Sequence, residues 1–215
     1  MGEGLGMAVE PLSKLPRGAQ NYYAILGRIV IEWNHAESQL RGMLSRMAGP
    51  EGTTAAMRAQ ILTSELGAVG LEHALRTHIA HLTDRKFAKS ATHAVDFYAR
   101  LRPYRNYYVH GILTLIAFKD TGYVGFIHYL EAKGKFVERR EMVLAKTLET
   151  LFGHATKFRV FAQGLVAYQV AQRIAALGGP TDIGKLPRRP PLPPQLQKPA
   201  RHLVAPPRRR KSSRA

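Results

Sequence analysis

The stretch YYAILGRIVIEWNHAESQLRGMLSRMA, residues 22 to 48, decides the fold class. Its large apolar residues recur at alternating steps of three and four, which places them on one face of an α-helix. Gly49 and Pro50 then end the pattern. A helix with one apolar face must bury that face against another element, so the pattern predicts a packed helical domain. The face consists of Leu26, Ile29, Trp33, Ala36, Leu40, Met43 and Met47.

Three further helical patterns follow along the chain. The second covers residues 53 to 82, where the apolar stripe shifts near Gly67 and Gly70 and indicates a break or a close helix approach. The third begins near Asp84, a suitable N-cap residue, and the fourth ends at Gly178. The expected inward positions of the third and fourth are Phe87, Ala91, Ala94, Tyr98 and Leu101, and then Leu144, Leu148, Leu151, Ala155, Phe158, Leu165 and Tyr168.

A β-rich segment separates the third and fourth helical patterns. The runs ILTLIAF, YVGFIHYLE and FVERREM are separated by the glycine-containing turns KDTG and AKGK, which predicts a small antiparallel meander at about 112–142. The sequence therefore predicts a mainly α protein, a four-helix bundle over residues 20–179 with the meander inserted before the last long helix. We expect residues 1–19 to form a flexible N-terminal segment.

The last part of the chain, residues 180–215, differs in composition from the rest. It contains nine of the 13 prolines, and it carries ten basic residues against one acidic residue. Few large apolar residues are present to offset the entropy of ordering, so we expect a disordered or partly extended Pro/Arg-rich arm. Its RRRK cluster could contact phosphates, act as a localisation signal or bind a partner. A solvated tail is equally compatible with the composition.

Charge and cysteine content limit the classes of function. The chain has 32 Lys and Arg against 15 Asp and Glu, a formal net charge of +17, which favours polyanionic partners such as nucleic acid. The absence of cysteine excludes disulfides, zinc-thiolate sites and cysteine nucleophiles. Because no segment has the pattern of a signal peptide or a membrane span, we expect a cytoplasmic protein without membrane contact.

The stretch RPYRNYYVHGIL, residues 102–113, combines polar residues at a helix end. Pro103 predicts a kink or restart of the helix, and Gly111 predicts a left-handed cap after His110. With 3.6 residues per turn, Arg105 and His110 would lie about 140° apart around the helix axis. Imidazole and guanidinium can supply what metal-free acid-base chemistry on a phosphodiester needs, since one transfers protons and the other binds the anion.

Arg105, Asn106 and His110 in RNYYVH resemble the R-x(4-6)-H motif of the HEPN superfamily, including the polar residue that often follows its arginine. The resemblance covers about residues 20–178, while the meander and the basic arm depart from it. It implies an all-α, HEPN-like bundle and a metal-independent endoribonuclease, of the kind found in toxin-antitoxin and antiviral defence systems. It also implies a homodimer in which the two motifs face one another, with an antitoxin or other defence-system protein as a further partner.

The resemblance also implies roles for individual residues. His110 would act as the acid or base, Arg105 would stabilise the phosphate and Asn106 would orient the substrate or its neighbours. RNA would be cleaved through its own 2′-hydroxyl, leaving a cyclic phosphate, without a cofactor or a metal.

Other residues near the motif are weaker candidates. Arg102 could contact phosphate, and Tyr104, Tyr107 and Tyr108 could stack on unpaired bases, although aromatic residues at this spacing are more often part of a core or a dimer contact. The pair His78 and His81 has a spacing that can bind a metal, but a third ligand is not evident.

Two readings of function therefore stay open. One is the ribonuclease, and the other is a non-catalytic helical module that binds nucleic acid or protein through its basic surface and arm. Glu37, beside the apolar face of the first helix, is expected either to pair with an arginine of the third helix and orient the motif, or to have a purely structural role.

Overall fold

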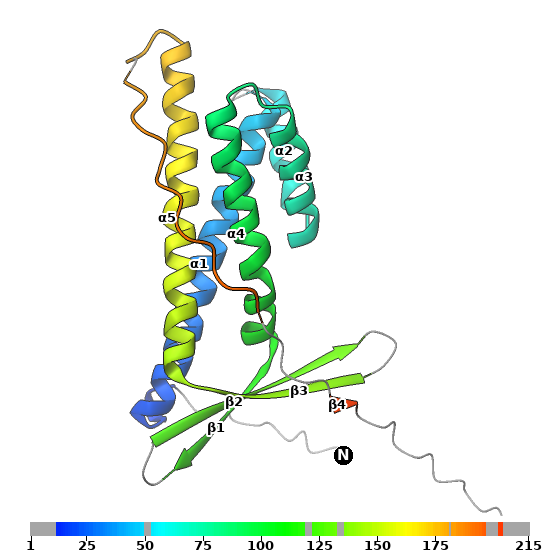
Figure 1. Cartoon of the computed structure of the whole chain (residues 1–215), viewed down its shortest axis with the longest axis vertical. Helices are drawn as coiled ribbons and strands as arrows, with labels where there is room; N and C mark the ends of the chain where they lie inside the picture. Colours follow the sequence, from blue (N-terminus) through cyan, green and yellow to red (C-terminus); the bar gives the residue numbers. More distant parts are fainter. Residues whose placement is uncertain are drawn as a thin grey trace, which may run out of the picture.

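The computed structural model of the protein describes residues 12–49, 53–118, 122–132, 136–180, 182–196 and 202–203. The fold is mainly helical, as the sequence predicts, and a short sheet lies at one end of the helices (Figure 1). The described residues contain five α-helices: α1 (Arg17–Ala48), α2 (Thr54–Ser64), α3 (Ala68–Ala80), α4 (Arg85–His110) and α5 (Ala145–Ala176).

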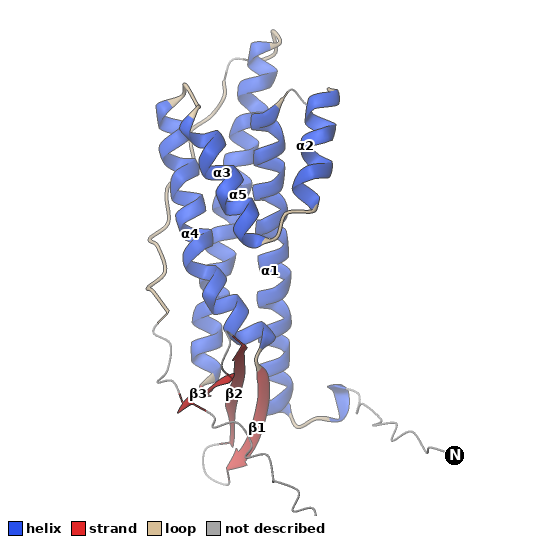
Figure 2. Cartoon of the chain, turned by 90° about the vertical axis from the view of Figure 1, so that its right-hand side faces the viewer, coloured by secondary structure: helices blue, strands red, loops and turns tan. Residues whose placement is uncertain are grey.

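The long helices α1 and α5 lie side by side and form the main contact of the bundle (Figures 1 and 2). The predicted face of α1 is the buried one, with Ile29, Trp33, Ala36 and Leu40 in the core. The helix starts at Arg17, directly after Pro16, which is earlier than the apolar pattern suggested. Residues 17–19 of the expected flexible segment therefore belong to the helix, while residues 1–11 lie outside the described part.

The second helical pattern is divided into two helices, so the expectation of four helices is wrong by one. The break follows Ser64, where Arg41 of α1 donates hydrogen bonds to the backbone carbonyls of Thr63 and Leu66. Carbonyls at a helix C-terminus have no partner inside the helix, so this guanidinium stabilises the end of α2. Gly67 then precedes α3, at the position where the apolar stripe shifts.

The helix α4 runs without interruption from Arg85 to His110. It begins as predicted at Asp84, whose carboxylate accepts hydrogen bonds from the backbone amides of Lys86 and Phe87, both at 3.0 Å. The expected restart at Pro103 does not occur, because α4 continues through this residue. Gly111 has φ −72° and ψ 151°, so the left-handed cap is also wrong: the chain leaves α4 directly in an extended conformation and enters a strand.

The strands pair in an antiparallel sheet of order β1-β2-β3-β4. β1 (Ile112–Phe118), β2 (Gly122–Ala132) and β3 (Phe136–Val143) follow one another, whereas β4 (His202–Leu203) comes from the C-terminal arm and pairs with β3. The hydroxyl of Tyr22 in α1 donates to the carbonyl of Val143 at 3.0 Å, which fixes the sheet to the bundle. A Cβ atom at Gly125 would lie 2.8 Å from the Tyr22 ring, so only glycine fits there.

Residues 182–196, here called the strap, return along α4 and α5 towards the sheet (Figure 1). This part of the arm, which was expected to be disordered or partly extended, lies as an extended segment against the bundle. The chain reverses after α5 at Gly178, whose φ is +85°, and the amide of Gly179 donates to the carbonyl of Ile174 at 2.9 Å, as in a Schellman motif. The leucines of the strap, Leu186, Leu192 and Leu196, pack against the core.

Hydrogen bonds fix the strap along one side of α4. His93 Nε2 contacts the carbonyl of Pro190 at 2.7 Å, and Arg100 Nη1 donates to the carbonyl of Pro193 at 3.1 Å. Proline carbonyls are free to accept such bonds in an extended chain, since that chain has no internal hydrogen bonds. Proline also restricts the unfolded chain, so composition alone overstated the entropy of ordering.

A polar network lies inside the bundle between α1 and α4. The Trp33 and Tyr98 rings stack with centroids 4.9 Å apart, and Trp33 Nε1 and the Tyr98 hydroxyl both donate to Glu37 Oε2, at 3.0 and 3.1 Å. Burial, and then the neighbouring carboxylate of Glu37, raise the pKa of Tyr98. Across the described part of the chain, no helix combines the length and the hydropathy needed to cross a membrane.

Candidate functional site at the end of α4

The last turns of α4 bring Arg105 and His110 together. Arg105 Nη1 lies 2.5 Å from His110 Nε2, and His110, the last residue of the helix, is exposed. The 140° separation around the axis does not prevent this contact, because the arginine side chain is long enough to reach along the helix. Because a guanidinium has donors only, this contact is a hydrogen bond only when Nε2 is the acceptor, that is, in the tautomer with the ring proton on Nδ1.

Asn106 completes a group of three polar residues. Its Oδ1 accepts a hydrogen bond from the same Arg105 Nη1 at 3.3 Å. Arg105 Nε is buried and has no hydrogen-bond partner among the described residues. The inner part of the guanidinium is thus enclosed while its Nη1 faces two neighbours. Such a cation is held in place by the fold before any anion arrives.

The backbone around these residues explains why His110 is accessible. The amide of Gly111 donates to the carbonyl of Tyr107 at 3.2 Å, which closes the last helical turn. The next residue, Ile112, already belongs to β1 and pairs with His128 of β2. His110 therefore lies at the junction of helix and sheet, where no further helical turn covers it.

Arg102 is not part of this group. Its Nη1 lies 2.7 Å from Oε2 of Glu72 on α3, in an ion pair whose side chains are 23% and 18% exposed. Glu72 also pairs with Arg76, which in turn contacts Asp96 at 3.0 Å. The expected phosphate contact of Arg102 would require breaking this bridge, so the structure assigns Arg102 to the packing of α3 against α4.

Two of the three tyrosines of the motif are buried in the core. Tyr107 and Tyr108 are 2% and 3% exposed and belong to the core, where their rings meet edge to face at 5.1 Å. Stacking on bases by these two rings is therefore wrong for this fold. Tyr104 is half-buried, stacks on Tyr108 and donates its hydroxyl to the carbonyl of Pro194 at 3.1 Å.

Two other candidates have structural partners. Glu37 pairs with Arg41 of its own helix at 2.6 Å and with Tyr98 of α4, and not with an arginine of α4. His78 Nδ1 contacts the carbonyl of Ala74 at 3.0 Å. Within the described ranges, no group of three or more His, Cys, Asp or Glu side chains is arranged to hold a metal ion.

Sequence reasoning missed His154, which faces the same region from α5. It lines a pocket of about 310 Å³ with Tyr104 and Tyr108, and Pro193 and Pro194 of the strap form another wall. Burial lowers the pKa of His154, and the charge of Lys157 lowers it further, so its imidazole is neutral near pH 7. No local pattern marks this residue, because α5 and the strap bring it beside Tyr104 and Tyr108 only in the folded chain.

Comparisons of the chain with protein families, with curated proteins and with solved structures found no match.

Proposed function

We propose that the protein is a metal-independent endoribonuclease of HEPN type, a toxin or antiviral defence effector, whose chemistry uses His110 and Arg105. The single observation that supports this most directly is the 2.5 Å contact between Arg105 Nη1 and His110 Nε2 at an exposed helix end. The motif resemblance supports the proposed family and fold type. The contact between Arg105 and His110 supports the proposed acid-base chemistry.

The resting pair suggests how a substrate would start the reaction. While Arg105 donates to Nε2, that nitrogen cannot take a proton. A phosphate is a stronger partner for a guanidinium than a neutral imidazole, because both of its charge-assisted hydrogen bonds can form at once. Nη1 of Arg105 would then donate to the scissile phosphate in place of the imidazole, and Nε2 would be free to accept the proton of the 2′-hydroxyl.

The rest of the step follows from balance of atoms and charge. The deprotonated 2′-oxygen attacks the phosphorus and the bond to the 5′-oxygen breaks, which leaves a 2′,3′-cyclic phosphate. Arg105 faces the extra negative charge of the transition state, and Asn106 keeps the guanidinium in position. A protonated imidazole, from the same or the opposed protomer of a homodimer, returns a proton to the leaving oxygen.

The decisive experiment is cleavage of labelled single-stranded RNA in EDTA by the wild type and by His110→Ala. We expect cleavage in EDTA, a loss of at least about 100-fold in the variant and a cyclic phosphate product. The control is His35→Ala, which removes an exposed histidine from the middle of α1. Replacing the RNA by DNA of the same sequence should abolish cleavage. If EDTA stops the reaction, the metal-free mechanism is wrong.

A second candidate function is supported by the charge and by the strap. The net charge of +17 favours polyanion binding whether or not catalysis occurs, and the strap carries Arg188 and Arg189 exposed on the bundle surface. In that case the protein is a non-catalytic module that binds nucleic acid or a partner protein. Salt-sensitive RNA binding without any cleavage, unaffected by His110→Ala, would favour this module over the enzyme.

A further inference from the structure

The pocket beside His154, here called the His154 pocket, has the size and the walls of a small ligand site. Its volume of about 310 Å³ is at the lower end of the range of about 300–1,000 Å³ that such sites occupy. Three elements form it: the end of α4, the first turns of α5 and the strap. Because these elements meet only in the folded chain, the shape of the pocket depends on the strap being in place.

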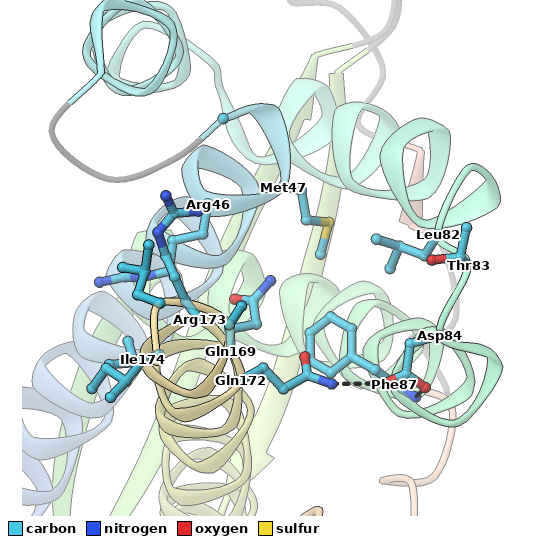
Figure 3. Close-up of a pocket in the computed structure, with 14 residues that line it drawn as sticks. Arg46, Met47, Leu82, Thr83, Asp84, Phe87, Gln169, Gln172, Arg173 and Ile174 are labelled. Atoms are coloured by element: carbon cyan, nitrogen blue, oxygen red, sulfur yellow. Dashed lines mark hydrogen bonds between the residues drawn. The ribbon is translucent and has the colours of Figure 1, made fainter. Parts of the chain in front are cut away.

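A larger pocket of about 650 Å³ lies at the other end of the bundle, at the last turns of α1 and α5 (Figure 3). Two of its polar side chains already have partners inside the protein. Gln172 Nε2 donates to Asp84 at 2.9 Å, and Arg46 Nη1 donates to the carbonyl of Gly42 at 3.1 Å. These bonds stabilise the helix ends, whereas the His154 pocket has polar groups that a ligand can reach.

One side of the His154 pocket favours a flat ring. Tyr104 is half-buried, and its hydroxyl donates to the carbonyl of Pro194 at 3.1 Å, which holds the tyrosine and the strap together. Pro193 lines the same side, and Leu101 of α4 and Leu151 of α5 line the rest. Aromatic rings pack well against flat partners, so a planar ligand fits against these residues.

One stripe of α5 gives the pocket a polar edge. Thr147, Thr150 and His154 follow one another at steps of three and four, which places them on the same face of the helix. Both threonines are exposed. The hydroxyl of Thr150 donates to the carbonyl of Lys146 at 2.9 Å, so its lone pairs remain for an N–H group of a ligand.

His154 supplies a second polar group. Its Nδ1 is enclosed and has no hydrogen-bond partner among the described residues, so it is not open to a ligand. The side chain is nevertheless partly exposed and lines the pocket, and Nε2 is the ring nitrogen that a ligand can reach. Burial, and then the charge of Lys157, lower the pKa of His154. In a neutral imidazole, Nε2 donates in one tautomer and accepts in the other, so it pairs with an uncharged polar group.

We propose that the His154 pocket holds one nucleobase, with its ring against Tyr104 and the strap and its polar edge facing Thr150 and Nε2 of His154. Nucleobases combine flat faces with hydrogen-bond donors and acceptors along one edge, as these two kinds of wall require. The site needs binding and not cleavage, so it goes beyond the proposed nuclease and does not depend on it.

The base can belong to an RNA strand or to a free nucleoside, and the position of the pocket favours the strand. Tyr104 directly precedes Arg105 in α4. It lies about 9 Å from His110 along the helix axis, six residues at about 1.5 Å each. An unpaired base in the pocket would therefore be held near the motif that the proposed nuclease uses.

The test is saturation-transfer NMR on the full-length protein with adenosine, cytidine, guanosine and uridine, followed by titration of those that bind. We expect the base protons of at least one nucleoside to receive more saturation than its ribose protons. Thr150→Val and His154→Leu should each weaken that nucleoside at least about threefold, since each removes one hydrogen bond. Leucine at position 154 also removes a buried nitrogen that has no partner, so the fold should tolerate it.

Thr92→Val is the matched control. Thr92 is also exposed, and its hydroxyl donates to the carbonyl of Ala88, four residues earlier, at 2.9 Å, but it lines a different pocket. This variant should bind the nucleoside as the wild type does. The proposal is overturned if no nucleoside binds, if ribose protons receive as much saturation as base protons, or if Thr150→Val and His154→Leu bind no more weakly than Thr92→Val.

A short single-stranded 2′-O-methyl RNA separates the two sources of the base. It lacks the 2′-hydroxyl and cannot be cut by the proposed mechanism, so the result does not depend on nuclease activity. We expect this RNA to displace the nucleoside from the wild type, which assigns the pocket to an RNA base. Nucleoside binding without displacement would assign the pocket to a free nucleoside and overturn the link to the motif. A failure of the proposed nuclease would appear differently, as absent RNA cleavage with nucleoside binding intact.

Discussion

Substitution of Glu37 by alanine tests the polar network that joins α1 to α4. The carboxylate accepts from Trp33 Nε1 and from the Tyr98 hydroxyl, and these residues are 3% and 0% exposed. Removing it leaves two buried donors without a partner, at about 1–3 kcal/mol each. Arg41 also loses its 2.6 Å contact but keeps the carbonyls at the end of α2. We expect Glu37→Ala to lower the free energy of unfolding by about 3–5 kcal/mol.

The assay is urea unfolding, followed by circular dichroism at 222 nm and by fluorescence. Trp33 is the only tryptophan of the chain, so its emission reports on the network itself. Glu37→Gln keeps one acceptor oxygen and should cost less than half as much. Glu149→Ala removes an exposed carboxylate of α5 and should change stability by about 0.5 kcal/mol or less.

The reasoning would be refuted by a Glu37→Ala protein that is within about 1 kcal/mol of the wild type and has unchanged fluorescence. That result would mean that water or another side chain satisfies the two donors. An equal loss in Glu37→Gln and Glu37→Ala would show instead that the negative charge, and not the acceptor geometry, holds the helices together.

Three other predictions concern the pH dependence, the strap and Arg102. The pKa of Asp84 is lowered in the folded protein, so the contribution of this carboxylate to stability is present at neutral pH and is lost as the pH falls below the ordinary carboxyl range. Asp84→Ala should lower the free energy of unfolding by about 1 kcal/mol at pH 7. In thermal unfolding, the variant should also lose less stability than the wild type between about pH 5 and 2. A Cβ at Gly164 would lie 3.0 Å from the strap, whereas a Cβ at Gly153 on the same helix meets nothing within 4 Å. Gly164→Leu should therefore speed trypsin cleavage within the strap several-fold and Gly153→Leu should not; equal rates would show that the strap does not depend on this contact. Glu72→Gln should destabilise the protein by about 1 kcal/mol without strengthening RNA binding, and tighter binding in a filter assay would return Arg102 to the list of phosphate ligands.

The sequence predicted the helices best where burial follows a simple period. The face of α1 was predictable because Ile29, Trp33 and Leu40 each face the core at a fixed angular step. The same rule failed at Leu144, which precedes α5 and is 50% exposed, since a residue just outside a helix does not follow its period. The cap at Asp84 was predictable because it depends on residues within one turn.

Features that depend on distant partners were not predictable. The end of α2 is stabilised by Arg41, which is more than twenty positions away, so no local pattern marks it. The sequence did not indicate an ion-pair partner for Arg102, because that partner, Glu72, lies on another helix. At the motif, spacing brought Arg105, Asn106 and His110 to attention, but it could not show that the arginine side chain reaches the imidazole.

The composition of the arm did not reveal that the strap packs against the bundle, and the reason is physical. Low hydrophobicity predicts disorder when a segment must build its own core, but the strap adds only a few leucines to a core that already exists. Its proline carbonyls then accept hydrogen bonds from His93 and Arg100. A basic, proline-rich stretch can therefore be an outer layer of a bundle.

The return path of the strap has a practical consequence for anyone who expresses this protein. A chain that ends after α5 would lose Leu186, Leu192 and Leu196. The apolar helix surfaces that these leucines cover would then be exposed to water and to other copies of the chain. Such a product would aggregate more readily and be less soluble than the intact protein, even though every helix is still present. A reporter attached after residue 196 would emerge near the sheet and not near the free end of α5 (Figure 1).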